Sequence, residues 1–265
     1  MNGLRPHPLI EVRDLDVGIG GHPVCHALNF SLAAGERLAI LGRNGAGKST
    51  LLSVLAGLRD ANAGEVRLGG ETYAALGPRA AAKRRGWLPQ RHSDAFASTV
   101  LETALTGRHP HLGRWDWESK RDAEIARGAL AAVGLAELEM RDVQTLSGGE
   151  RQRLAIATLL TQAAPLYLLD EPLAHLDLNH QIAVLELFAD AARGQAGDAG
   201  AAVVMVLHEP ALAWRYCDRA LLIHGDGRCE LGPVREMLTA ERLSALYQHP
   251  LRAIEADGTI GFIPR

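Results

Sequence analysis

The chain has no hydrophobic run long enough to cross a membrane. Its longest candidates, residues 201–207 and 166–169, have the length of a buried strand, whereas a spanning helix needs about 18 apolar residues or more. The first eight residues carry one charge and two prolines but no apolar core, so neither a secretory signal nor a lipid anchor is evident. We expect a protein that stays in the cytoplasm.

Cysteine, net charge and metal-binding patterns are also scarce. The three cysteines have no close CxxC spacing, which suits a reducing compartment. A formal net charge of −3 gives no electrostatic reason to bind nucleic acid, so no nucleic-acid partner is expected. None of the eleven histidines belongs to a paired pattern such as HExxH. His109 and His111, on either side of Pro110, come closest to one, and a metal site there stays an alternative.

What the sequence does contain is an α/β pattern. With 47% hydrophobic and 22% charged residues, the composition is that of a globular protein of about one large domain. Residues 8–90 are strand-rich, residues 91–163 carry alanine- and leucine-rich stretches typical of helices, and strands alternate with helices again over residues 164–224. We therefore predict one domain over residues 8–265, with a helical insertion in an α/β core and a small cap over residues 225–265.

A glycine-rich loop follows one predicted strand, residues 37–41, and precedes a predicted helix, residues 49–55. This is the context that a phosphate-binding loop needs. Its glycines allow backbone conformations that a side chain would block, so successive N–H groups can surround a polyphosphate. Lys48 is expected to reach the β- and γ-phosphates, and Ser49 to ligate Mg²⁺. The predicted nucleotide-binding residues of this segment are Gly42, Arg43, Asn44, Gly45, Ala46, Gly47, Lys48, Ser49 and Thr50.

Two adjacent carboxylates, Asp170 and Glu171, end the apolar run of residues 166–169. A strand points adjacent side chains in opposite directions, so the two carboxylates are expected to do different work. Asp170 suits the Mg²⁺ shell as the acidic partner of the phosphate loop. Glu171 can polarise an attacking water. Together with the phosphate loop, the pair predicts an ATP hydrolysis site.

A second pair of glycines lies in residues 146–152, ahead of a helix predicted over residues 153–160. Exposed N–H groups and the positive end of a helix dipole form a further phosphate-binding surface there. One nucleotide does not need two such surfaces on one monomer. With these segments, Gln90 and His208 in this order, the chain resembles an ATP-binding cassette (ABC) ATPase over nearly its whole length.

This resemblance implies a P-loop NTPase core with an antiparallel β subdomain and an inserted α-helical subdomain. It also implies two cassettes that meet head to tail as a homodimer, with ATP of one chain covered by Ser147, Gly148, Gly149 and Glu150 of the other. Asp177 matches the acidic residue of the loop between the two sites, and His208 matches the switch histidine that orients Glu171. The implied catalytic residues are Lys48, Gln90, Glu171 and His208, and the implied Mg²⁺ ligands are Ser49, Gln90 and Asp170.

The chain departs from the family pattern in two places. The family usually stacks adenine on an aromatic residue before the phosphate loop, and this chain offers Ile19 instead. An aliphatic contact lacks a stacking contribution of about 1 kcal/mol, so we expect weak discrimination between ATP and GTP. His175 stands in the interface loop where a small residue is common, and its role is open.

Residues 106–113 and 175–181 are similar to those of importers of iron-siderophore complexes, haem and cobalamin. In that group a periplasmic binding protein delivers substrate to a membrane permease dimer, and a separate ATPase drives it from the cytoplasmic face of the inner membrane. Residues 90–117 would then receive the permease's coupling helix. Trp115 and Trp117 are expected to add apolar contacts in that groove or to lie in the core. Replacing Arg108 or Trp115 is expected to reduce transport and spare basal hydrolysis.

Two other functions stay open. A cassette protein that acts on DNA or the ribosome would have the same ATPase site. The single cassette and the lack of a long coiled-coil insertion or a basic tail argue against it. An exporter subunit would differ only in its membrane partner, and the segment of residues 109–111 favours import.

Overall fold

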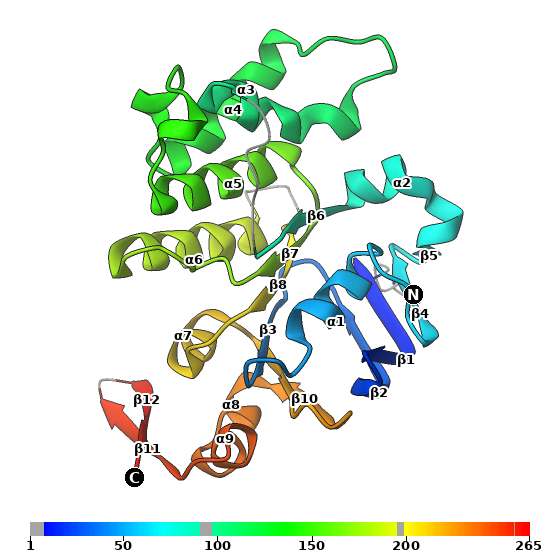
Figure 1. The fold of residues 1–265 in the computed structure, drawn as a ribbon, viewed down its shortest axis with the longest axis vertical. Coiled ribbons are helices and arrows are strands. Elements are labelled where there is room, and N and C mark those ends of the chain that lie inside the picture. The colour runs from blue at the N-terminus through cyan, green and yellow to red at the C-terminus, as the bar shows by residue number, and fades with distance from the viewer. Residues whose placement is uncertain (1–7, 91–96, 195–198, 257) are drawn as a thin grey trace, which may run out of the picture.

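The computed structural model describes residues 8–90, 97–194, 199–256 and 258–265 (Figure 1). Within these ranges the largest sheet has six strands in the order β10-β9-β3-β8-β7-β6, of which β10 alone runs antiparallel to its neighbour. Every residue of β7 and β8 is buried, as expected for central parallel strands covered on both faces. The strands are β3 Arg37–Gly42, β6 Arg85–Leu88, β7 Leu166–Asp170, β8 Ala202–Val206, β9 Arg219–Ile223 and β10 Cys229–Pro233.

A second, antiparallel sheet has the order β2-β1-β4-β5. Helix α1, Lys48–Leu55, packs between the two sheets, where its leucines are fully buried in a core shared by both. Gly64 lies inside a strand of this sheet, which pairs with β1 from Ala63 onward. The strands are β1 Ile10–Ile19, β2 His22–Leu32, β4 Ala63–Leu68 and β5 Glu71–Thr72.

The helical subdomain is the name used below for the helices between β6 and β7, which form the upper part of Figure 1. Three of its α-helices begin with a capping box, in which a serine or threonine side chain and the acidic side chain three residues later bond to each other's backbone N–H. The elements are α3 Val100–Leu105, η1 Thr106–His111, α4 Lys120–Ala132, η2 Ala136–Leu138, η3 Val143–Thr145 and α5 Gly148–Gln162.

Helix α5 corrects one prediction. It begins at Gly148, not at residue 153, because the Ser147 side chain caps it and draws both glycines into its first turn.

The remaining elements are three helices that lie between strands in the chain order and a C-terminal group of two helices and two strands. A hairpin of β11 and β12 packs against α7. No helix among the residues described is both long and apolar enough to span a membrane. The elements are α2 Tyr73–Arg84, α6 Leu178–Arg193, α7 Pro210–Tyr216, α8 Val234–Met237, α9 Ala240–Tyr247, β11 Leu251–Ala256 and β12 Thr259–Pro264.

Candidate nucleotide-binding site

The phosphate loop runs from the end of β3 to the start of α1, and close neighbours fix its glycines. Gly47, the residue before α1, has a φ of 93°, and a Cβ there would lie 2.4 Å from a methyl carbon of Val24. A Cβ at Gly42 would lie 2.5 Å from the carbonyl oxygen of Ile223. Only glycine fits at either position, so the loop backbone is held in place by β2 and β9.

Lys48 is buried at the start of α1, with 5% of its surface exposed. Its Nζ donates hydrogen bonds to the carbonyl oxygens of Gly42, at 2.9 Å, and Arg43, at 3.0 Å. Burial lowers the pKa of Lys48, and the negative charges of Glu171 and Asp170 oppose that shift in part. The ammonium group therefore lies over the loop backbone.

Asp170 and Ser49 meet across the site. The Ser49 hydroxyl donates to Oδ1 of Asp170 at 3.0 Å, although the two residues come from α1 and β7. Asp170 is 3% exposed. Burial raises the pKa of its carboxyl above the ordinary value, and the Ser49 hydrogen bond opposes this rise. The result is a buried pair of oxygen donors at the C-terminal edge of the large sheet.

Glu171 lies just beyond the end of β7, in a left-handed conformation with a φ of 52°. Its Oε1 is 2.9 Å from Nε2 of His208, and Gln90 also hydrogen-bonds to its carboxylate. Burial raises the pKa of Glu171, but the bonds to His208 and Gln90 outweigh burial, and the pKa falls below its usual range. Asp170 and Glu171 do face different partners. The sequence argument, that adjacent residues of one strand point in opposite directions, was wrong here because β7 ends at Asp170 and Glu171 lies outside the strand.

These groups surround a cavity of about 430 Å³. Asp170 is not on its wall, and nor are Gly42, Arg43 and Ala46 of the predicted loop residues. Ile19, which stands where the family usually has an aromatic residue, lines the cavity and is 41% exposed. The lining residues are Ile19, Asn44, Gly45, Gly47, Lys48, Ser49, Thr50, Gln90, Glu171 and His208.

Arg43 makes a contact that sequence reasoning missed. One of its guanidinium nitrogens donates to Oε1 of Gln248 at 2.5 Å, immediately after helix α9. The two residues are 205 positions apart and belong to no shared motif. The phosphate loop is thus tied to the C-terminal part of the chain.

The predicted second phosphate-binding surface lies apart from the cavity. None of the residues 147–150 lines it. The backbone N–H of Glu150 donates to Oγ of Ser147 at 3.3 Å, and the N–H of Ser147 donates to the Glu150 carboxylate at 2.8 Å. Asp177, also predicted to bind nucleotide, is exposed and caps α6 through the N–H of His180 at 2.9 Å. A single chain therefore does not bring these residues to the phosphate loop.

His175 packs against this second surface. It has a φ of 63°, and its carbonyl oxygen lies 3.1 Å from where a Cβ at Gly149 would stand. Gly149 therefore leaves room for the loop that carries His175. As for the suggested metal site, His111 is 2.8 Å from the carbonyl oxygen of Gln162. In the described part of the chain no group of three or more potential ligands could hold a metal ion.

A buried lysine over a glycine loop, a serine bonded to an aspartate on the neighbouring element, and a glutamate beside a histidine define the site of a P-loop nucleoside triphosphatase. The ABC transporter family model matches residues 25–174, and the chain belongs to this family. This match confirms the predicted family.

Relatives in this family have transport names. The chain is 41% identical to the cobalamin import ATP-binding protein BtuD of Halobacterium salinarum over 255 residues, which are 96% of this chain and 62% of that protein. It is 42% identical to the hemin import ATP-binding protein HmuV of Deinococcus radiodurans over 247 residues, 91% of each chain. The chain thus spans less than two thirds of the length of the first relative.

A solved structure has the same fold. A chain of a metal-chelate type ABC transporter in an inward-facing conformation superposes with a TM-score of 0.82 and 30% sequence identity, covering 97% of this chain and 98% of that chain. This likeness confirms the predicted fold class, an α/β cassette with an antiparallel sheet and inserted helices.

Proposed function

We propose that this chain is the ATP-hydrolysing subunit of an ABC importer, and that two copies close head to tail on two ATP molecules to drive a membrane permease dimer. The observation that carries the proposal is the division of the phosphate-binding groups. Lys48 and Glu171 line the cavity, whereas Ser147 lies exposed on a different surface. A second copy of the chain can supply what the first cavity lacks.

Each side chain of the cavity has a role in this proposal. Lys48 stabilises negative charge that develops on the transferred phosphoryl group. Glu171 accepts the proton of the attacking water, for which its lowered pKa keeps it ionised at neutral pH. His208 holds the Glu171 carboxylate in position. Gln90, which follows β6, binds the same carboxylate.

The oxygen donors around Asp170 fit a magnesium ion. The Ser49 hydroxyl and the buried Asp170 carboxylate lie within 3.0 Å of each other, and Gln90 lines the same cavity. Mg²⁺ prefers oxygen ligands and is usually held by one or two carboxylates together with substrate phosphates. When bound, the ion would neutralise phosphoryl charge. Burial raises the pKa of the Asp170 carboxyl, and a nearby cation would favour its ionised form.

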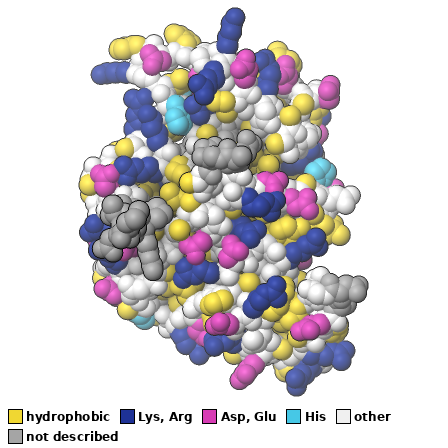
Figure 2. Space-filling view, turned by 180° about the vertical axis from the view of Figure 1, so that it is seen from behind, with side chains coloured by type: hydrophobic (Ala, Val, Ile, Leu, Met, Phe, Trp, Pro, Cys, Tyr) yellow, Lys and Arg dark blue, Asp and Glu magenta, His cyan; other side chains and the backbone are white. Residues whose placement is uncertain are grey.

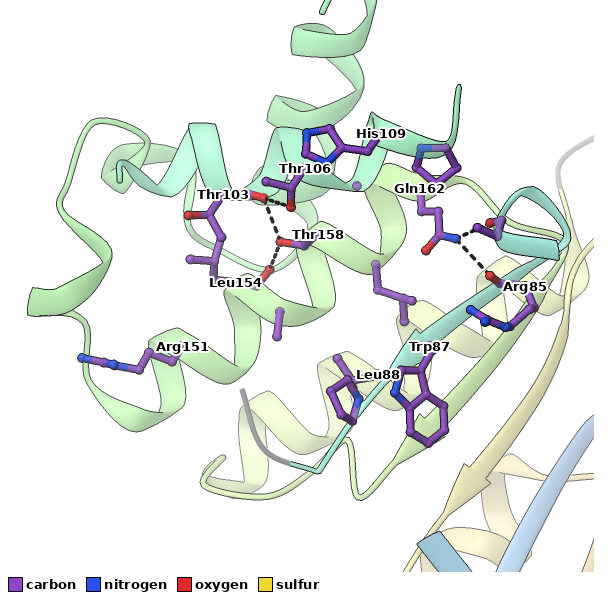
Figure 3. Close-up of a pocket in the computed structure, with 16 residues that line it drawn as sticks. Arg85, Trp87, Leu88, Thr103, Thr106, His109, Arg151, Leu154, Thr158 and Gln162 are labelled. Atoms are coloured by element: carbon purple, nitrogen blue, oxygen red, sulfur yellow. Dashed lines mark hydrogen bonds between the residues drawn. The ribbon is translucent and has the colours of Figure 1, made fainter. Parts of the chain in front are cut away.

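A groove of about 520 Å³ between the large sheet and the helical subdomain suits the permease's coupling helix. Figure 3 shows β6, with Trp87 and Leu88, on one side and α5, with Thr158, on the other, next to Thr103 of α3 and Thr106 of η1. Gln162 of α5 donates to the carbonyl oxygen of Arg85 in β6 at 2.9 Å, so the two sides are joined at one end. An amphipathic helix laid in this groove would contact both parts of the chain at once.

The names of the relatives support a chelate cargo. The relatives named above are import proteins for cobalamin and hemin, and the solved neighbour is of the metal-chelate type. We therefore propose an iron-siderophore, haem or cobalamin-type chelate as the substrate, delivered by a periplasmic binding protein. The ATPase would work at the cytoplasmic face of the inner membrane, bound to its permease.

One experiment tests this proposal. A tagged Glu171→Gln chain is trapped with Mg·ATP, extracted from its native membranes in mild detergent, and its copurifying proteins are identified by mass spectrometry. We expect a polytopic permease and, by its genetic neighbours, a candidate substrate. Recovery of ribosomal or nucleic-acid-binding proteins alone would overturn the transport function, and recovery of an exporter permease would overturn import.

A further inference from the structure

Two tryptophans of the helical subdomain lie outside both places expected for them. Trp115 is 85% exposed and Trp117 is 88% exposed, so neither belongs to the core. Neither lines the groove described above. Both belong to the loop between η1 and α4, which stands out from the upper end of the ribbon in Figure 1.

The loop that carries them is structured at both ends. The N–H of Gly113 donates to Oδ2 of Asp116 at 2.8 Å, and the N–H of Asp116 donates back to the Gly113 carbonyl oxygen at 3.3 Å. After the second tryptophan, Ser119 and Asp122 form the capping box of α4. A fixed turn and a capped helix therefore hold the two rings in solvent. Exposed apolar side chains of this size often mark an interaction surface.

Three cations and two carboxylates are exposed around the two rings. The Arg114 guanidinium lies 5.7 Å from the centre of the Trp115 ring, and Lys120 and Arg121 are exposed at the start of α4. For the residues that the structure describes, no carboxylate lies within ion-pair distance of these three side chains. Figure 2 shows Lys and Arg side chains at this end of the molecule, with Asp and Glu side chains among them.

Of the neighbouring carboxylates Asp122 is buried, whereas Asp116 and Glu118 are exposed, and each of the three has a partner within the subdomain. Asp122 accepts from Arg108 at 2.8 Å, and Asp116 is taken up by its own turn. Glu118 lies 3.9 Å from His109. The outward surface therefore combines two amphipathic rings with three unpaired cations.

We propose that this loop, residues 112–121, docks on the anionic headgroup region of a membrane. Tryptophan rings sit preferentially at the membrane–water interface, and cations near an anionic surface add to the attraction. The orientation rests on the proposed function. His109 lines both the groove and the hollow beside the tryptophans, so the loop borders the groove in which the permease is placed.

Vesicle binding by the isolated full-length chain, without permease, tests the proposal. Sedimentation with phosphatidylglycerol–phosphatidylethanolamine vesicles is compared with phosphatidylcholine vesicles, and brominated lipids quench the tryptophans that insert. The half-buried Trp87 and Trp214 give the background. The test variant is Trp115→Ser with Trp117→Ser, and the matched control is Met140→Ser, which removes a 73% exposed side chain of the same subdomain.

The proposal expects binding to anionic vesicles that falls at least about tenfold in the tryptophan variant and about fivefold for each of Arg114→Gln, Lys120→Gln and Arg121→Gln. The control should bind as the parent chain does, and unchanged ATP hydrolysis shows that each variant is folded. Equal binding by parent and tryptophan variant would overturn the proposal. So would a loss of permease capture without any vesicle binding, which would assign the loop to a protein contact. Neither result would alter the permease copurification that tests the importer itself.

Discussion

The two helices that we propose to face phosphate begin in opposite ways in this chain. Helix α1 begins after Gly47 with no side-chain cap, and its first turn lies between two sheets beside a buried lysine. Helix α5 begins with a complete capping box of Ser147 and Glu150, on the surface. The N–H groups of α1 are left for a ligand, whereas one of those in α5 is already satisfied by its own chain.

This difference indicates which half of the site is ready before ATP arrives. The first N–H groups of the uncapped helix have no side-chain partner, and a phosphate can accept hydrogen bonds from them. In the proposed dimer the capped helix meets phosphate only when a second chain presents it. The predictions below test that division, from the largest expected effect to the smallest.

The largest effect should come from Glu171→Gln. Loss of the base should lower ATP turnover at least about 100-fold, the lower bound of what general-base catalysis contributes. Nucleotide binding should remain, because Lys48 and the loop are unchanged, and an ATP-bound dimer should accumulate. Phosphate release and size-exclusion chromatography with Mg·ATP measure the two outcomes. Glu186→Gln, an exposed change on α6, is the control, and fast hydrolysis by Glu171→Gln would remove Glu171 from the role of base.

Mixing two inactive variants tests whether the halves act between chains. Ser147→Asp keeps a good capping side chain but places negative charge where phosphate should approach, and Lys48→Ala disables the other half. Each alone should be inactive. Their mixture should recover about a quarter of wild-type turnover, since half of randomly formed dimers are mixed and each has one of two sites intact.

Ser119→Asp gives the matched control for that experiment, because Ser119 caps α4 with the same capping box. It should leave hydrolysis unchanged. No recovery on mixing, with both variants folded, would mean that the signature residues act on their own chain's ATP.

A third change should destabilise the helical subdomain and leave the phosphate loop and helix α1 unchanged. Arg108 is bonded to Asp122 and to the carbonyl oxygen of Thr161 at 3.1 Å, and both ion-pair side chains are 12% exposed. Arg108→Ala removes the ion-pair partner of Asp122, which keeps its bonds to Ser119, and should lower the free energy of unfolding by about 1–3 kcal/mol. These bonds favour a structural role for Arg108 over the transport-specific role expected from the sequence. Thermal unfolding measures the loss of stability, and ATP affinity shows whether the phosphate loop is unchanged.

The same pair has a pH signature. Hydrogen bonds from Ser119 and then Arg108 lower the pKa of Asp122 from 3.8 to about 2. A lowered pKa means that this stabilisation is complete above pH 3.8 and is lost as the pH falls toward 2. Arg108→Ala should therefore differ most from the parent at neutral pH and converge with it in acid. A constant difference across that range would contradict the ion pair.

The smallest effect should come from Ile19→Tyr. A ring at this position of the cavity wall can stack on adenine, which should tighten ATP binding by about 1 kcal/mol, or roughly fivefold. The parent chain should bind ATP and GTP with similar affinity. Titration calorimetry with both nucleotides measures this. A hundredfold preference for ATP in the parent would show that base recognition does not depend on Ile19.

How much the sequence predicted follows the same division. The phosphate loop, Asp170 and Glu171 could be predicted because local glycine spacing and buried strands fix them, and β7 and α6 lie within residues 164–224, where alternating strands and helices were predicted. The start of α5 was missed because a serine cap overrides the low helix propensity of two glycines. The conformation of Glu171 was missed because a left-handed φ outside glycine leaves no mark in residue type.

Contacts between distant segments could not be predicted. The full exposure of Trp115 and Trp117 depends on a turn closed by Asp116, which composition alone does not distinguish from a core loop. The Arg108–Asp122 pair joins η1 to α4 across a loop, and no motif records it. Single-sequence reasoning locates chemistry that lies in continuous motifs and misses bonds that only the folded chain creates.

The hydrogen bond from Arg43 to Gln248 has a practical meaning for anyone who alters this chain. A fusion, affinity tag or deletion that shifts the end of α9 also releases a side chain of the phosphate loop. Hydrolysis rates from differently tagged preparations would then differ for a reason unrelated to the intended change. The segment after α9 should be kept intact when such rates are compared.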